Sequence, residues 1–392
     1  MTGSKASDGS KEARLLLVGG GHAHVAVLAD LIRRGLPAGA GLPPGAGQPA
    51  GARCVLLTPE PSLRYSGMVP GWLVGQHGRG EGVVDLAGLA ARAGVELVLG
   101  RCIGLDPEAR VVRMAGGGKI AFEVASFDTG GQGRGAALLG DDPRLIDIRP
   151  ISAFVDRIAA LHAPGPALAR VVVAGGGAGG VELAFALRNL AWAPLPPQVT
   201  LATGAGGLLP GFAPAVRRRA AKTLARQGIA VIAEDVRFEG GMLMAGARSL
   251  EPADLVIAAL GSAAPPWVRA SGIAADAGGF MAVDAHHRSL LHQHIFAAGD
   301  VAARADRALP HSGVHAVFAG PVLAANLRAA LAGEPPQRTY RPRWNNLYLM
   351  NTGDGSAIAS YGPLAATGAW VLALKHRIDK GWIAKYAALA RA

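Results

Sequence analysis

The sequence predicts an α/β protein built from two doubly wound domains, with the second domain inserted into the first. The main observation is an internal repeat, because an apolar strand, a glycine-rich turn, a helix and a second strand occur at residues 14–57 and again at residues 170–202. A third apolar strand, ending in Gly299 and Asp300, returns late in the chain. A glycine-rich turn between a parallel strand and a helix is typical of Rossmann-like nucleotide-binding units, so we expect two such units.

The composition favours a globular protein with a large core. The chain has 392 residues, of which 50% are hydrophobic and 17% are charged, so disorder is not expected. Aromatic residues make up only 5%, which leaves little for base stacking, and no nucleic-acid-binding motif is recognised. We therefore expect no nucleic-acid partner. The formal net charge of +11 also suits an anionic cofactor or an anionic membrane surface.

The cysteines and the apolar segments favour a cytoplasmic location. Cys54 and Cys102 are too few for a disulfide framework or, without help, for a four-ligand zinc site. Residues 1–11 contain no apolar segment of a secretory signal, and we identify no apolar stretch of the roughly 20 residues that a transmembrane helix needs. Peripheral attachment to the inner face of the membrane remains the alternative.

The repeat sets the expected domain boundaries. Residues 1–12 are predicted to be a disordered tail, and residues 37–52, which contain only Gly, Pro, Ala, Leu and Gln, are predicted to be an exposed insertion. The expected units are a first domain at 13–155 and 283–335, a second domain at 156–282, and a C-terminal interface region at 336–392.

The first glycine turn reads GGGHAH at residues 19–24. Gly19 allows the tight turn, and Gly21 removes a side chain so that the backbone can approach a pyrophosphate. The amides of His22 and Ala23, at the start of the helix, then face the phosphates. His24 replaces the third glycine of the usual pattern. A tight strand-to-helix turn without a ligand is the alternative interpretation of this segment.

The second turn reads GGGAGGVELA at residues 175–184 and fits the GxGxxG pattern completely, with Gly175, Gly177 and Gly180 as its glycines and Ala178 between them. Two such turns, each after an apolar strand and before a helix, are hard to obtain by chance. The sequence therefore favours two dinucleotide sites.

These motifs resemble those of the pyridine nucleotide–disulfide oxidoreductase superfamily. Residues 175–184 resemble its nicotinamide-domain fingerprint, and residues 295–300 resemble its late FAD motif, whose Asp binds the ribityl chain. Residues 127–130 (FDTG) and 258–261 (AALG) stand where the two "ATG" turns of the superfamily belong, although the second lacks the Thr. The resemblance spans residues 15–331 in the expected order.

Two further segments resemble one branch of that superfamily. Residues 65–71 (YSGMVPG) and 351–355 (NTGDG) are similar to type II NADH dehydrogenases, to sulfide:quinone oxidoreductases and to the oxidoreductase domain fused to selenide, water dikinase. The resemblance implies an enzyme with FAD and NAD(P)H as cofactors and a quinone-like electron acceptor. Because no cysteine lies between Cys54 and Cys102, we expect neither a redox disulfide nor cysteine-based sulfide oxidation.

The resemblance also assigns residues to FAD. Asp300, after Gly299, would accept hydrogen bonds from the ribityl hydroxyls, and it is equally suited to cap the next segment. The amides near Ala316 and Val317, at the start of a helix at 314–331, would face the flavin ring. The adenosine ribose position of the first unit holds Thr58, with Glu60 as a reserve carboxylate. The expected FAD contacts are completed by Arg64, Thr129 and Gly130.

In the second unit the ribose position holds Thr203, and Gly261 belongs to the second "ATG" turn. No Asp or Glu occurs between Glu182 and Glu234, whereas six Arg and Lys residues do. NADPH is therefore favoured over NADH if a nicotinamide cofactor binds here, because arginine can bind a 2′-phosphate. The alternative is that these cations form a solvated helix face.

Glu182 and Tyr65 are the candidate catalytic residues. Glu182 lies near a helix start, where its charge complements the dipole. By resemblance it lies close to the nicotinamide and flavin, where it would handle protons during reduction of a quinone-like acceptor. A helix-start carboxylate without a catalytic role is the alternative. Tyr65 begins the segment that would pass over the flavin ring.

No metal site is expected. His22 and His24 are two residues apart, a spacing that does not place them on one helix face. The four histidines between residues 286 and 294 precede a strand, and we interpret them as a surface loop rather than as ligands.

The C-terminal segment at about 370–389 mixes Trp, Leu and Ile with Lys and Arg, which suits a helix on anionic lipid, on the core or on a second subunit of a homodimer.

The motifs and the resemblance are compatible with three functions. The leading one is electron transfer from NAD(P)H through FAD to a quinone or another small acceptor. In the second, a sulfur or selenium compound reduces the flavin directly and the nicotinamide site is vestigial. In the third, the protein is a non-catalytic flavin-binding partner.

Overall fold

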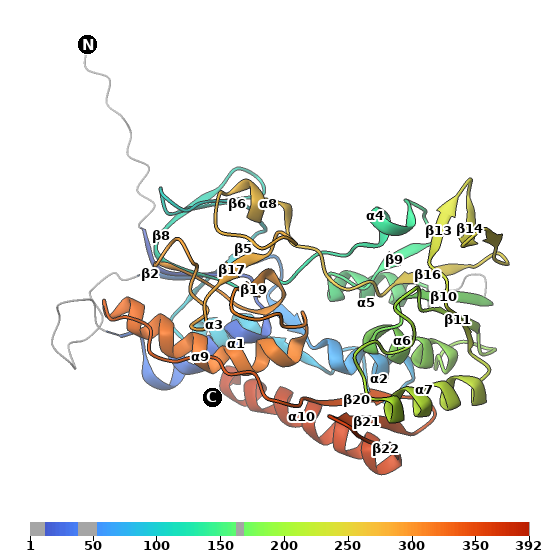
Figure 1. Cartoon of the computed structure of the whole chain (residues 1–392). Coiled ribbons are helices and arrows are strands. Elements are labelled where there is room, and N and C mark those ends of the chain that lie inside the picture. Colours follow the sequence, from blue (N-terminus) through green and yellow to red (C-terminus); the bar gives the residue numbers. More distant parts are fainter. Residues whose placement is uncertain (1–11, 38–52, 162–167, 392) are drawn as a thin grey trace.

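The computed structural model describes residues 12–37, 53–161 and 168–391, so the predicted tail and insertion lie almost entirely outside the described residues. Two α/β lobes lie side by side, and a long C-terminal helix runs along both of them (Figure 1). Each lobe has its own sheet with a parallel core, so the structure confirms the predicted α/β class with two doubly wound sheets.

The first lobe is built on a sheet in which β5, β2, β1 and β8 are neighbours and pair in parallel. Strand β18 adds in parallel to the C-terminal half of β8, although the second lobe separates the two strands in sequence. β6 and β7 form an antiparallel extension on the N-terminal half of β8. The bounds are β1 (Ala13–Val18), β2 (Arg53–Thr58), β5 (Glu96–Leu99), β6 (Cys102–Asp106), β7 (Val111–Met114), β8 (Lys119–Phe127) and β18 (Ile295–Ala297).

Helices α1 (His22–Arg34) and α9 (Gly313–Leu331) pack closely on each other against this sheet. A Cβ at Gly320 would lie 2.7 Å from the Cβ of Ala26, so the glycine permits the close approach. By length and composition α9 is apolar enough to cross a membrane, which corrects the expectation that no stretch qualifies. Half of its apolar window is buried inside the structure, so packing in the core explains its composition.

The second lobe has a five-stranded parallel sheet in the order β12-β11-β10-β16-β9. Strand β9 precedes residue 156, the expected start of the second domain, yet it pairs with β16 of this sheet. An antiparallel sheet of β13, β14 and β15 is attached. The strands are β9 (Leu145–Asp147), β10 (Arg170–Ala174), β11 (Gln198–Ala202), β12 (Ala230–Ile232), β13 (Val236–Glu239), β14 (Met242–Ala245), β15 (Arg248–Ser249) and β16 (Leu255–Ala258). The helices are α4 (Gly135–Leu139), α5 (Ile151–Ala160), α6 (Ala178–Arg188) and α7 (Pro214–Arg226).

Smaller elements border the sheets and connect the lobes. The segment after β2 forms a short hairpin and a turn of helix that reach toward the second lobe, because α2 packs on α6. The segment after β2 contains β3 (Ser62–Arg64), α2 (Val69–Leu73), β4 (Val83–Asp85) and α3 (Leu86–Arg92). The other small elements are α8 (Pro266–Ala270), β17 (Met281–Val283) and β19 (Ala302–Arg304).

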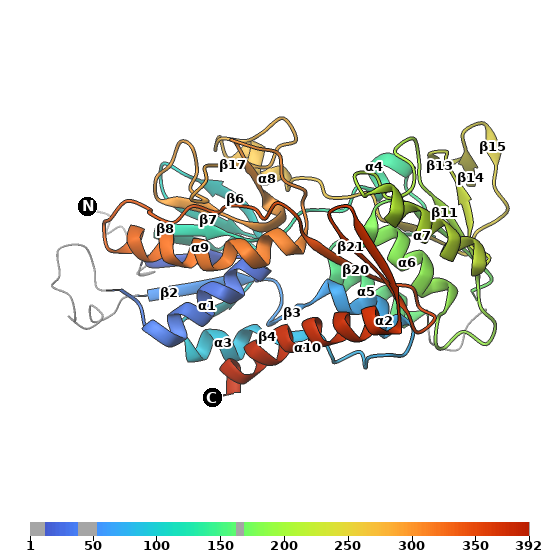
Figure 2. The same cartoon turned by 60° about the horizontal axis from the view of Figure 1, so that its bottom comes forward.

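The C-terminal region consists of an antiparallel sheet and one long helix. The sheet contains β20 (Leu347–Asn351), β21 (Ala357–Tyr361) and β22 (Leu364–Gly368), and helix α10 (Ala369–Arg391) follows. Helix α10 packs on α3, β4 and α1 of the first lobe and on β20, β21 and β22 (Figure 2). It buries Lys375 and Asp379 as well as apolar side chains, while Trp370 and Ile378 are 61% and 45% exposed. Of the three settings expected for this helix, the structure shows packing on the chain's own core.

Candidate functional site

The first glycine turn joins β1 to α1 beside the end of β8. Gly19 has a φ of +93°, and a Cβ there would lie 2.4 Å from the carbonyl oxygen of Asp128, so only glycine fits. Its amide donates to the carbonyl of Leu57 on β2. The turn lines a cavity of about 730 Å³, which is the size of an ordinary cofactor site.

The Asp128 carboxylate binds the first amides of α1, and the sequence analysis does not assign this residue to the site. Its Oδ2 accepts hydrogen bonds from the amides of Ala23 (2.8 Å) and His24 (3.1 Å). The Ala23 amide, expected to face a phosphate, is therefore bound to a carboxylate of the chain itself. Burial raises the pKa of Asp128 to about 7, although the two amides oppose this shift. The sequence does contain a signal, because Asp128 stands where the resembled "ATG" turn has Ala.

His24 replaces the third glycine by bonding to the turn that it interrupts. Its Nδ1 lies 2.6 Å from the Gly19 carbonyl oxygen, and its Nε2 lies 2.9 Å from Ser126 Oγ. Because a carbonyl only accepts, Nδ1 donates, and in the neutral ring Nε2 accepts from the serine. Burial lowers the pKa of His24 to about 4, so the ring is neutral at pH 7. His24 thus fixes the turn and does not bind a ligand in this arrangement.

Most of the residues expected to bind FAD line the same cavity. They are Gly19, Gly21, His22, Thr58, Glu60, Arg64, Thr129, Gly130, Gly299, Asp300 and Ala316. Ala23 and Val317 are not among its lining residues. Within the described residues, Glu60 accepts a hydrogen bond from Ser152 Oγ, and Arg64 Nη1 donates to the Arg79 carbonyl at 2.8 Å.

Asp300 has a cationic partner that the sequence analysis misses. Its Oδ2 lies 2.7 Å from Nη1 of Arg149, which precedes α5 and also lines the cavity. The Arg149 Nε is buried and has no hydrogen-bond partner within the described residues. A buried donor without a partner is a place where a ligand acceptor would be stabilised.

The second turn has the same backbone connections but is more open. Gly175 donates to Ala202 on β11, as Gly19 donates to Leu57, and Ala259 donates to Ala174, as Asp128 donates to Val18. A Cβ at Gly177 would meet nothing within 4 Å, whereas a Cβ at Gly180 would lie 2.0 Å from the Gly175 carbonyl oxygen. Of the residues expected to bind here, neither Ala178 nor the three glycines line the large cavity, but Gly179 does.

The ribose position of the second unit holds a threonine whose hydroxyl is already hydrogen-bonded within the chain. The Thr203 hydroxyl, nearly buried, lies 3.2 Å from the Ile232 carbonyl, and Gly261 has open space around it. A Cβ at Gly204, the next residue, would lie 2.3 Å from Oδ1 of Asp235. This carboxylate comes from beyond β12, so the search for an acid at the end of β11 does not find it.

Two arginines of the second unit already have partners within the chain. Arg188 Nε donates to the Gln227 carbonyl, and Arg226 pairs with Asp354 of the C-terminal region. Arg217, Arg218 and Arg219 are exposed on α7. The interpretation of these cations as a helix face with its own partners therefore fits the structure better than a 2′-phosphate site.

Glu182 pairs with Lys375 of α10, which in turn pairs with Asp379, and the sequence analysis connects neither residue with it. Lys375 Nζ lies 3.7 Å from Glu182 Oε1 and 3.1 Å from Asp379 Oδ2, and it donates to the Gly67 carbonyl at 2.9 Å. Glu182 also accepts from the Asn351 amide at 2.8 Å. Burial raises the pKa of Glu182, which lines the large cavity. Burial also disfavours the Lys375 ammonium, but the two carboxylates outweigh it and raise the pKa of Lys375.

Tyr65 stacks on Trp382 of α10, with ring centroids 5.0 Å apart, and its hydroxyl donates to Asp379 Oδ1 at 3.1 Å. Burial and the neighbouring carboxylates raise the pKa of Tyr65 well above its ordinary value, so it stays protonated at neutral pH. His22 packs against both rings. Within the described residues, His22 Nε2 and Trp382 Nε1 are buried without hydrogen-bond partners.

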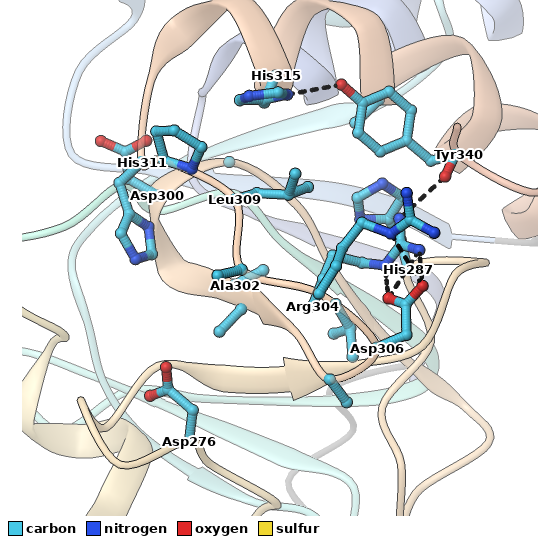
Figure 3. A pocket seen from close by; sticks show the side chains of 18 of the residues that line it. Asp276, His287, Asp300, Ala302, Arg304, Asp306, Leu309, His311, His315 and Tyr340 are labelled. Carbon is cyan, nitrogen blue, oxygen red and sulfur yellow. Dashed lines mark hydrogen bonds and ion pairs between the residues drawn. The ribbon is translucent and has the colours of Figure 1, made fainter. Parts of the chain in front are cut away.

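A second cavity, of about 460 Å³, shares Gly299 and Asp300 with the first as lining residues, and Figure 3 shows Asp300 at its side. Arg304 pairs with Asp306 and donates to the Tyr340 carbonyl, and the Tyr340 hydroxyl lies 2.9 Å from His315 Nδ1. These four side chains are paired within the chain, whereas His287 Nε2 and Ser312 Oγ, which also belong to the lining residues, are buried without hydrogen-bond partners within the described residues. No group of three or more metal-ligating side chains occurs within the described residues.

Comparison with known protein families decides the identity of this arrangement. Residues 13–320 match the family described as pyridine nucleotide-disulphide oxidoreductase. The chain belongs to this family. The match covers both glycine turns and the Gly299–Asp300 motif, so the resemblance inferred from the sequence is confirmed, and the protein is an oxidoreductase of a flavin-dependent family.

Solved structures of this family share the fold. A sulfide:quinone oxidoreductase from the hyperthermophilic bacterium Aquifex aeolicus is 17% identical, with a TM-score of 0.72 over 96% of this chain and 92% of that chain. The putidaredoxin reductase of a covalent complex with putidaredoxin is 20% identical, with a TM-score of 0.69 over 89% and 81%. A NAD-dependent persulfide reductase from A. fulgidus is 17% identical, with a TM-score of 0.70 over 89% of this chain and 64% of that chain. A search of curated protein sequences finds no significant match.

The two cysteines of this family member are not arranged as a redox pair. Cys54 and Cys102 are free and buried on different strands, and burial raises the pKa of each thiol to about 11. At neutral pH both are therefore thiols, which are poor nucleophiles. The expectation of chemistry without a disulfide relay is consistent with this geometry.

The residues around the first turn fit the FAD that the resemblance implies. Gly20 and Gly21 border the cavity without side chains, His22 and Arg149 each present a buried nitrogen without a partner, and Asp300 lies at its edge. Glycine amides at a helix start suit a pyrophosphate, and carboxylates suit sugar hydroxyls.

Proposed function

We propose that the protein is an FAD-dependent oxidoreductase that passes electrons from NAD(P)H through flavin to a quinone or another small acceptor, without a redox disulfide. The observation that carries the proposal is a single cavity bordered by both lobes: Gly19, Gly20 and Gly21 come from the first lobe, and Gly179 and Glu182 from the second. FAD, when bound, would supply hydride acceptance and onward electron transfer.

The residues of the first lobe would bind and orient FAD. The backbone of Gly20 and Gly21 would lie against the pyrophosphate, Asp300 would accept from ribityl hydroxyls, and the start of α9 at Ala316 would face the flavin ring. Glu60, which also lines the cavity, would accept from the adenosine ribose.

Glu182, Lys375 and Asp379 would manage the proton that accompanies electron transfer to a quinone-like acceptor. The group holds two carboxyls and one ammonium in a buried place, so one carboxyl is stabilised by carrying a proton. Burial raises the pKa of Glu182, which lines the cavity, so we propose Glu182 as the carboxyl that carries the proton. Glu182 would thus hold a proton at Oε1 or Oε2, at the edge of the cavity, while Asp379 and Lys375 keep it in place.

An anaerobic titration of the purified yellow protein tests this function. We expect NADH or NADPH to bleach the flavin absorbance and a quinone analogue to restore it. In Glu182→Gln, flavin reduction should persist while turnover with the quinone slows about a hundred-fold, the lower end of the range for acid–base catalysis. Glu234→Gln, which changes an exposed carboxylate of the same lobe, is the matched control. Protein that is colourless and stays free of FAD after incubation would refute the proposal.

A second candidate is direct reduction of the flavin by a sulfur or selenium compound, with a vestigial nicotinamide site. Thr203 favours it, because a hydroxyl bonded to the Ile232 carbonyl stands where an acid normally binds ribose. Sulfide or selenide would then bleach the flavin while both nicotinamides fail. If no donor bleaches it, a non-catalytic flavin-binding role is the remaining function.

We also propose a peripheral membrane location for the protein. The exposed side of α10 carries Trp370, Ile378, Arg377, Lys380 and Lys385, a mixture that suits an anionic lipid surface. Co-sedimentation with anionic vesicles, and its loss in Trp370→Ser, would support this location. Concentration-dependent dimerisation without vesicle binding would favour the homodimer instead.

A further inference from the structure

We propose that Asp128 is a resident anion of the first glycine turn and that FAD binding takes up a proton at its carboxyl group. This inference rests on the proposed FAD site. It concerns how that site tolerates a pyrophosphate beside a carboxylate that belongs to the chain.

The Asp128 carboxylate lies at the start of α1. The first amides of a helix have no partner within the helix, and a phosphate is bound by such amides in dinucleotide folds. In α1 the capping residue is Gly21, which has no side chain to bind them. Asp128 Oδ2 bonds the Ala23 and His24 amides instead, from a strand end 105 residues away. A negative group already occupies part of the place that attracts a pyrophosphate.

The Asp128 carboxylate is closely bordered by glycines of two turns. A Cβ at Gly21 would lie 2.3 Å from Asp128 Oδ1, and a Cβ at Gly299 would also lie 2.3 Å from it. Oδ1 therefore lies between the two turns, and Gly21, Gly299 and Asp128 all line the large cavity. Within the described residues Oδ1 has no hydrogen-bond partner. A proton on Oδ1 gives it a donor to offer to a phosphate oxygen, whereas an ionised Oδ1 repels one.

The charged neighbour of Asp128 is another carboxylate, Asp300. From α1, Asp128 is contacted by the amides of Ala23 and His24, and the rings of His22 and His24 in the same turn are neutral because burial lowers the pKa of each to about 4. From the turn after β18 it is faced by Asp300, a like charge whose own cationic partner is Arg149. No cation pairs with Asp128 within the described residues. Two phosphate charges added to this setting disfavour the ionised carboxyl further.

The balance of protons follows from these contacts. Burial raises the pKa of Asp128 to about 7, so the free protein holds a mixture of both forms at neutral pH. The bound state holds the carboxylic acid. Binding therefore takes up a fraction of a proton at pH 7 and close to one proton at about pH 8.5.

The second turn provides an internal control. Ala259 stands at the position of Asp128 and offers a methyl group, so no carboxyl is present to take up a proton there. Nicotinamide binding at that turn is expected to proceed without this proton.

The experiment is a titration of the flavin-free protein with FAD, followed by quenching of flavin fluorescence, from about pH 6 to about pH 9. We expect the Kd to be flat at the acidic end and to rise about ten-fold per pH unit above about pH 7.5. Asp128→Asn keeps an oxygen for the two amides but cannot ionise. Its Kd should not vary with pH and should be at least about ten-fold lower than that of the native protein at pH 8.5.

The control variant is Asp85→Asn, because Asp85 caps α3 through the Gly88 amide and does not line the cavity. It should keep the pH slope of the native protein. Calorimetry in two buffers of different ionisation enthalpy counts the proton directly and does not depend on a variant that folds. Tight FAD binding with no pH slope and no proton uptake overturns the inference and leaves the proposed function intact. Failure to bind FAD at every pH refutes the proposed function itself.

Discussion

The two glycine turns of this protein have the same backbone and different chemistry. In both, the amide of the first glycine donates to a carbonyl of the neighbouring strand. A Cβ on that glycine would meet the carbonyl of the residue after a third strand, which is Asp128 after β8 in one turn and Ala259 after β16 in the other. In the first turn, Asp128 binds the helix amides, and in the second a methyl group leaves those amides open. In the proposed cofactor sites the backbone of each turn would bind an anion, and the side chain that follows β8 or β16 would decide how much of that site remains free.

The third glycine shows a related difference. Gly180 lets α6 approach its turn so closely that a Cβ would lie 2.0 Å from the Gly175 carbonyl oxygen. At the same place in the first turn, His24 replaces this contact with a hydrogen bond to the Gly19 carbonyl and a second bond to Ser126. A close approach and a hydrogen-bonded ring are two ways to fix one turn.

The largest expected effect comes from a change that breaks the shared backbone. Gly19→Ala would place a Cβ 2.4 Å from the Asp128 carbonyl oxygen at a φ of +93°, and we expect a loss of about 3 kcal/mol in the free energy of unfolding. Gly177→Ala, where a Cβ meets nothing within 4 Å, is the matched control and should stay within about 0.5 kcal/mol. Urea denaturation measures both. Equal losses would show that the turn tolerates a side chain at Gly19.

The next prediction transfers the anion from one turn to the other. Ala259→Asp would place a carboxylate at the open start of α6, and like-charge repulsion should raise the apparent Kd for NADH or NADPH at least about ten-fold. The flavin content should not change, because the first turn is untouched. The dependence of the flavin bleaching rate on nicotinamide concentration measures the effect. An unchanged Kd would mean that the start of α6 does not bind the cofactor.

The third prediction concerns the histidine that locks the first turn. Burial lowers the pKa of His24 from 6.5 to about 4, so the stability that the neutral ring contributes is present above pH 6.5 and is lost as the pH falls toward 4. His24→Asn should reduce the slope of unfolding free energy against pH by up to about 1.4 kcal/mol per unit in this window. Comparing variant and native protein by urea denaturation at each pH cancels the contributions of His22 and His287. Parallel curves would contradict a neutral buried His24.

The smallest expected effect concerns the choice of nicotinamide. Thr203→Glu restores an acid at the end of β11, where it would accept from a ribose and repel a 2′-phosphate. We expect the ratio of NADH to NADPH affinity to rise about five-fold, a modest gain because the Thr203 side chain is nearly buried. Thr200→Glu, on the same strand but before its end, is the control for an added charge. A fall in the ratio would contradict the predicted orientation of the ribose.

The sequence predicts the parts of this protein that depend on local patterns. Strand, glycine turn and helix lie within a few residues of one another, so the two turns and the Gly299–Asp300 motif can be located without a structure. Asp128 is harder to assign because its partners, the Ala23 and His24 amides, are 105 and 104 residues away. Lys375 reaches Glu182 only because α10 packs between the first lobe and the C-terminal sheet, which no local pattern indicates. The apolar composition of α9 likewise reflects its packing on α1.

The placement of α10 has a mechanical consequence. Its Lys375 is bound at once to the Gly67 carbonyl of the first lobe and to Glu182 of the second, and both contacts are buried. Rotation of one lobe against the other would have to separate the Lys375 ammonium from one of these partners. We therefore expect α10 to resist changes in the spacing of the two lobes when ligands bind.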